Sequence, residues 1–149
     1  MQNSKFKIQN FFVPFCILHF TFLISCSVPN LEKPECGAAR QTVKELYSYH
    51  FGNDMKFSRE NLKQREKFLT DDLKLYLSNQ PESAADYFTA TDDYPKAFRV
   101  GVCKIIEPEK RVNFQILLFW KDDNRNEQRE MNVEIVNEKD EWLVNKVAN

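Results

Sequence analysis

The chain has 149 residues, of which 42% are hydrophobic, and its 21 basic and 22 acidic side chains give a formal net charge of −1. Because it has no basic excess to neutralise phosphate groups, nucleic acid is not expected as a partner. Three isolated glycines and two histidines argue against a glycine-rich phosphate loop and a histidine-rich metal site. We therefore expect no metal and no cofactor.

The first 25 residues have the layout of a bacterial export signal. Lys5 and Lys7 form a short basic start, and an apolar run follows from Phe11 to Ile24. That run contains a proline and a histidine and is too short for a comfortable membrane span. The segment is therefore predicted to direct export rather than to remain as a transmembrane helix.

The run ends in Leu23-Ile24-Ser25-Cys26, which resembles a lipobox. In a lipobox the cysteine receives diacylglycerol and becomes the mature N-terminus. An ordinary signal peptidase site is the alternative, because Ser25 and Ser27 place small residues three and one positions before a cut. Lipidation of Cys26 would hold the chain in the bacterial cell envelope, on the outer side of the cytoplasmic membrane or at the outer membrane.

Removing residues 1–25, which hold two lysines and no acid, leaves 124 residues with a net charge of −3. That length suits one domain with a single core. Once Cys26 is assigned to the lipid, Cys36 and Cys103 are the two cysteines left. An oxidising compartment lets such a pair form a disulfide, worth roughly 4 kcal/mol for a loop of this size. Two buried free thiols are the alternative, because spacing alone does not decide.

The predicted domain begins with helices. Residues 26–35 contain two prolines and no periodicity, which indicates a tether. Apolar residues then recur at helical spacing from about Cys36 to His50. A second helical region opens at Ser58, a candidate N-cap flanked by an apolar pair placed as a hydrophobic staple. Because Thr70 is a further N-cap candidate, we predict two short helices with a bend between them.

The last third of the chain changes to an alternating pattern that predicts strands. Residues 79–97, which precede it, have two prolines and three aspartates and predict either a short strand or a functional loop. Turn-forming residues separate four alternating runs, which indicates an antiparallel meander. The runs lie at residues 98–102, 112–120, 131–135 and 142–144.

The second predicted strand is apolar on both sides. Leu117 and Phe119 point to the side opposite Ile116, Leu118 and Trp120. Since a helical layer can cover only one of these sides, we predict that Leu117 and Phe119 form an exposed interaction surface. The expected partner is a second copy of the chain, giving a homodimer, or another envelope protein. Charged residues at both positions should then abolish association and leave the fold intact.

The whole pattern resembles the nuclear transport factor 2-like, cystatin-type α+β cone. The resemblance covers residues 36–149 and is carried by the alternating run 128–136, a polar turn and the final Glu141-Trp142-Leu143-Val144-Asn145-Lys146-Val147. It also resembles small exported, uncharacterised bacterial lipoproteins of that superfamily. The resemblance implies an α+β fold, with N-terminal helices packed on a curved antiparallel sheet of about four strands. It fixes no activity, because members isomerise, dehydrate, bind small ligands or associate with proteins.

Candidate chemistry is confined to one small group of residues. Tyr47 and His50 lie on the apolar side of the first predicted helix, and Asp54 follows it closely, so the three could serve acid–base catalysis. The alternative is that His50 and Tyr47 are satisfied at the edge of the core while Asp54 caps a turn.

Two functions remain open at this point. The favoured one is a membrane-tethered, exported binding or protein-interaction module with an unknown ligand and no catalytic activity. The other is a small hydrolase or isomerase-like enzyme that uses the interior of the cone.

Overall fold

The computed structural model describes residues 31–148. The predicted signal at residues 1–25, the predicted lipid-attachment residue Cys26 and most of the predicted tether lie outside the described residues. The elements below belong to one compact unit, Glu32–Asn149. Within residues 31–148, no helix has both the length and the hydropathy needed to cross a membrane.

The unit is α+β, with three α-helices and a short 3-10 turn preceding one sheet. The helix α2 starts two residues earlier than predicted, because Pro34 suits the first turn of a helix. Pro34 and Glu35 therefore belong to the helix and not to the tether. The helical elements are α2 Pro34–Phe51, α3 Arg59–Arg65, η2 Glu66–Phe68 and α4 Asp71–Ser78.

Both predicted N-caps are confirmed. The Ser58 side chain accepts a hydrogen bond from the Asn61 amide at 3.2 Å, and Thr70 Oγ1 accepts one from the Leu73 amide at 3.2 Å. Each bond satisfies an amide that has no partner inside its own helix. The predicted bend between the two short helices falls at η2.

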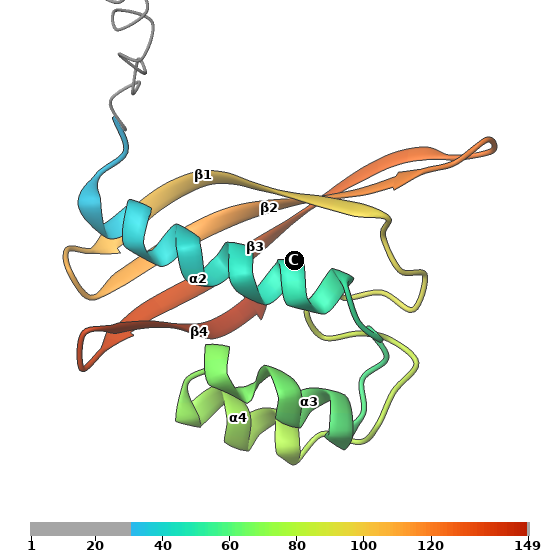
Figure 1. Cartoon of the computed structure of the whole chain (residues 1–149), viewed down its shortest axis with the longest axis horizontal. Helices are drawn as coiled ribbons and strands as arrows, with labels where there is room; N and C mark the ends of the chain where they lie inside the picture. Colours follow the sequence, from blue (N-terminus) through green and yellow to red (C-terminus); the bar gives the residue numbers. More distant parts are fainter. Residues whose placement is uncertain (1–30, 149) are drawn as a thin grey trace, which may run out of the picture. The chain divides into compact units, whose positions relative to one another are not determined.

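The sheet is an antiparallel meander in the order β1-β2-β3-β4, as predicted. Register shifts interrupt the β1–β2 pairing after Val100 and the β3–β4 pairing after Glu134, and the strands bend along their length (Figure 1). Lys139 and Asp140 both have positive φ, which closes the last hairpin with a two-residue turn. The strands are β1 Ala97–Glu107, β2 Arg111–Lys121, β3 Asn126–Glu138 and β4 Glu141–Ala148.

The main core lies between α2 and one face of the sheet, which we call the inner face (Figure 1). Alternate residues of β2 supply the centre of that face, and five of them are buried in the core cluster. The short helices are joined to the edge strand β4, because the Thr70 amide donates to the Val144 carbonyl at 3.0 Å. The five β2 residues are Val112, Phe114, Ile116, Leu118 and Trp120.

Candidate functional site

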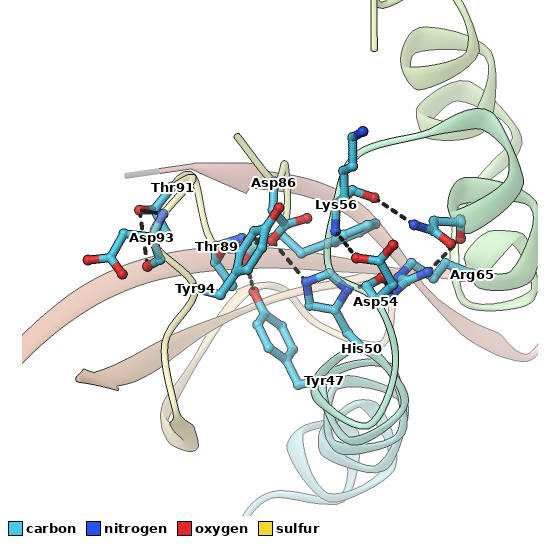
Figure 2. A network of polar contacts seen from close by, with 12 residues as sticks. Tyr47, His50, Asp54, Lys56, Arg65, Asp86, Thr89, Thr91, Asp93 and Tyr94 are labelled. Carbon is cyan, nitrogen blue, oxygen red and sulfur yellow. Dashed lines mark hydrogen bonds and ion pairs between the residues drawn. The ribbon is translucent and has the colours of Figure 1, made fainter. Parts of the chain in front are cut away.

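A buried polar network joins the end of α2, the end of α3 and the loop of residues 79–96 (Figure 2). His50 is its centre and is 0% exposed. Its Nε2 lies 2.9 Å from Asp86 Oδ2, and Arg65 Nε donates to its Nδ1 at 2.8 Å. Arg65 and Asp86 are each 2% exposed, so the ion pair that His50 bridges is shielded from solvent.

The hydrogen bonds fix the protonation of the imidazole. A guanidinium has only donors, so Nδ1 of His50 must accept from Arg65 through its lone pair. The proton of the neutral ring therefore sits on Nε2 and is donated to Asp86. Because both ring nitrogens are occupied, His50 has no nitrogen left for a substrate while this network holds.

The two charged ends of the network are also satisfied by the surrounding chain. Asp86 Oδ2 accepts from the amide and the hydroxyl of Thr89, each at 2.7 Å. Arg65 donates to the carbonyls of Asn61 and Asp54 at 2.6 and 2.7 Å. Burial lowers the pKa of Arg65, and the negative charge of Asp86 opposes that shift. These hydrogen bonds hold two helices and a loop together, so the role of the network is structural.

The other two predicted candidates do not complete an acid–base group. Tyr47 is fully buried and donates its hydroxyl to the Phe88 carbonyl at 2.8 Å, and burial raises its pKa far above the usual range. The Asp54 carboxylate is at the surface and accepts from the Lys56 amide at 2.9 Å, which lowers its pKa. Only the backbone carbonyl of Asp54 reaches Arg65. The geometry thus agrees with the alternative interpretation, in which Tyr47 and His50 have hydrogen-bond partners at the edge of the core and Asp54 caps a turn.

Two members of the network were missed from the sequence. Arg65 follows Leu62 by three residues, so a charged residue interrupts the apolar side of the second helical region. Asp86 is an isolated acid between Ala85 and Tyr87, within an otherwise apolar stretch. Each was a signal of a buried charge, although neither indicated its partner.

An open groove lies beside the network, between α4, the 79–96 loop, the middle of β3 at Met131 and the end of β4. It encloses about 500 Å³, and a neighbouring hollow of about 460 Å³ shares Tyr76, Tyr87 and Val147 with it. Among the described residues that line the larger part, Asp86 is the only charged one. Tyr47 and His50 are absent from both linings, so the predicted catalytic candidates do not converge on this groove.

The second candidate site is the sheet face turned away from α2, which we call the outer face. Leu117 and Phe119 lie on it, out of phase with the core residues of β2. Leu117 is nevertheless only 5% exposed, and its cross-strand neighbours are Arg99 and Glu130. Phe119 is half-buried. Leu117 is therefore not freely exposed as expected, because side chains on the same sheet face shield a central strand.

More accessible apolar side chains stand on β1 of the outer face. Val102 is 71% exposed and Ile106 is 49% exposed, each beside an irregularity in the β1–β2 pairing. A hollow of about 340 Å³ lies between them and the polar side chains of Asn113, Gln115 and Asn132. The outer face thus has exposed apolar groups that the sequence did not single out.

The predicted disulfide is confirmed. Cys36 near the start of α2 is bonded to Cys103 on β1, with Cα atoms 6.0 Å apart. The bond ties the first helix to the sheet across 67 residues of chain. Glu32 lies close to both sulfur atoms, but it is engaged by Arg40 in a two-point ion pair. Because the two sulfur atoms are bonded to each other, they are not available as metal ligands in this cluster.

Comparisons with known proteins identify no family and no function for the chain. No protein-family model matches the chain, and no curated protein matches it. Among solved structures, it is similar to a protein of unknown function from Bacteroides thetaiotaomicron VPI-5482, with 14% sequence identity and a TM-score of 0.41. The match covers 77% of this chain and 88% of that one. The resemblance to the nuclear transport factor 2-like superfamily stays a prediction.

Proposed function

We propose that the chain is an exported interaction module, held at a bacterial envelope membrane by a lipid on Cys26, that works through contacts of its outer face. The observation that carries the proposal is the outer face itself. It displays Val102 at 71% and Ile106 at 49% exposure on β1 and half-buried Phe119 further along β2, whereas α2 covers the inner face. Accessible apolar groups on an ordered sheet favour binding to another protein surface.

Two further observations support this function over the enzyme. His50 and Tyr47 are fully buried and bonded to protein groups, so neither is available for proton transfer at the groove. The Cys36–Cys103 disulfide fits the oxidising compartment that the export signal implies. A small hydrolase or isomerase-like activity has only Asp86 of the groove in its favour.

The anchor is tested by replacing Cys26 with Ala in the full chain. Lipidation at that residue predicts that the unsubstituted protein fractionates with membranes and that the Cys26→Ala protein does not. A Cys16→Ala variant is the matched control and should stay with the membrane fraction. If the Cys26→Ala chain also remains entirely in membranes, the apolar run is the anchor and the lipid assignment is wrong.

The contact function is tested with Val102→Lys/Phe119→Lys in the full chain. After extraction in mild detergent, the unsubstituted protein should migrate as a complex and the double variant as a single chain, with similar melting temperatures. Gln41→Lys, on the exposed side of α2, is the control and should keep the complex. A double variant that keeps the complex would contradict the role of the outer face.

A further inference from the structure

The outer face carries its charges in two separate rows. Arg99 and Lys104 stand on β1, while Glu130 and Glu134 stand on β3, and the register places β2 between them. Reading across the strands, Arg99 is level with Leu117 and Glu130, and Lys104 is level with Asn113 and Glu134. The face is therefore basic along β1 and acidic along β3. The central strand β2 is apolar and polar between them except at its start, where Arg111 is balanced by Glu134 of its own chain at 3.9 Å.

These rows do not pair with each other within one chain. Two strand spacings, about 10 Å, separate β1 from β3, and the side chains of β2 lie between them. Within residues 31–148, neither Arg99 nor Lys104 forms an ion pair with an acid. The cations of β1 are thus left for a partner that presents acids at a matching spacing.

We propose that the partner is a second copy of this chain, packed face to face across a two-fold axis that runs along β2. This inference rests on the proposed contact function and names its partner. Rotation about that axis keeps the height of each residue along the strands and exchanges the β1 side for the β3 side. Arg99 then faces Glu130 of the partner subunit and Lys104 faces Glu134 of the partner subunit, twice each, while Leu117 and Phe119 meet their own counterparts.

The charges also select this axis over the other face-to-face arrangement. A two-fold axis across the strands would lay β1 on β1 and β3 on β3, so that Arg99 approached the Lys104 side and Glu130 the Glu134 side. Like charges in contact oppose association. A membrane surface is a poor alternative occupant, because the acidic row of β3 would be repelled by anionic lipids.

The size of the face predicts a modest, reversible dimer. Four strands spaced about 4.8 Å apart, over about nine residues of length, project roughly 500 Å². Two such faces bury on the order of 1,000 Å², near the lower limit for a specific interface. The dimer should therefore depend on the local concentration, which anchoring in one membrane raises.

Arg99 and Glu130 make the sharper pair to test. Glu134 has Lys146 as its neighbour on β4 and Arg111 within 3.9 Å, so its charge is already partly balanced. Among residues 31–148, the Glu130 carboxylate accepts a hydrogen bond only from the neutral side-chain amide of Gln115, at 2.8 Å. Reversing Arg99 or Glu130 therefore changes the interface charge without removing an ion pair inside the chain.

The experiment is a charge exchange between two differently tagged full-length chains in membranes. Both carry Asn113→Cys, a polar, half-buried position on the outer face of β2 that the axis places opposite itself, and a short bifunctional thiol reagent reports the dimer, because facing sheets lie about 10 Å apart. Arg99→Glu alone and Glu130→Lys alone should each lower the cross-linked homodimer at least tenfold. Co-expression of the two should restore a product carrying both tags, because each new contact then joins opposite charges.

Restoration also proves that both variants fold, so a loss in the single variants cannot be attributed to misfolding. A Gln41→Cys chain and a chain without Asn113→Cys are the controls, and neither should give a cross-linked dimer. Single variants that dimerise normally, or a mixture that fails to recover while both variants melt normally, would overturn the second-copy partner. Cross-linking of Asn113→Cys to a different protein, with no homodimer, would overturn the homodimer and leave the contact function standing. If neither a homodimer nor a cross-link to another protein forms, both the homodimer and the contact function are overturned.

Discussion

The two faces of β2 differ in whether their side chains are already covered or bonded by other residues of the same chain. Leu118 and Leu117 are neighbours of the same type, with exposures of 0% and 5%, yet only Leu118 belongs to the main core. On the inner side, even the buried charges are satisfied, as the bonds of His50 to Arg65 and Asp86 illustrate. On the outer side, Arg99 and Val102 remain exposed. Low exposure alone therefore does not distinguish a residue needed for folding from one needed for contact.

The disulfide is the largest single contribution expected on the inner side. Replacing Cys36 and Cys103 together with Ala should lower the free energy of unfolding by about 4 kcal/mol, because the unfolded chain loses a cross-link that spans 67 residues. Chemical denaturation of oxidised and reduced protein measures the effect. The double variant should not respond to reductant. An unchanged unfolding midpoint after reduction would show that the bridge does not stabilise the domain.

Removing a charged end of the buried network should cost nearly as much. Asp86→Ala leaves the Nε2 proton of His50, both donors of Thr89 and the charge of Arg65 without their acceptor, at about 3 kcal/mol or more. Urea denaturation gives the value. Asp54→Ala is the matched control, because its carboxylate lies at the surface, and should cost about 1 kcal/mol or less. Similar losses in the two variants would contradict the structural role given to Asp86.

The adjacent leucines of β2 give a matched test of the two faces. Leu118→Ala removes core contacts and should lower the free energy of unfolding by about 3 kcal/mol. Leu117→Ala should cost about 1 kcal/mol, because only its neighbours on the sheet face cover it and solvent can fill the space. Thermal unfolding followed by circular dichroism measures both. Equal losses would mean that Leu117 belongs to the main core.

The smallest expected effect is at the surface pair of Glu32 and Arg40. The hydrogen bond from Arg40 lowers the pKa of Glu32 below its unfolded value, so the ionised carboxylate favours the folded state. That contribution is present above the unfolded pKa and is lost as the pH falls through the folded pKa. Glu32→Gln should cost less than about 1 kcal/mol at neutral pH and nothing at low pH. A cost that persists at low pH would rule out the charge as its cause.

Most of the fold could be predicted from the sequence because its signals are local. Ser58 and Thr70 are followed by the amides that they cap, and the alternation of β2 depends only on strand geometry. The contact of His50 with Asp86 joins residues 36 apart through a loop without periodicity, so no local pattern could predict it. The shielding of Leu117 was equally hidden, because it depends on which residues the register places beside it.

The most direct test of the division between the two faces is the free energy of unfolding of Phe119→Lys, measured alongside the detergent-extracted complex of the same full-length chain. The division predicts that stability stays within about 1 kcal/mol of the unsubstituted protein, because the half-buried ring lies on the outer face. It predicts at the same time that the complex dissociates into single chains. A loss of stability comparable to that of Leu118→Ala, or a complex that survives the added charge, would contradict the account.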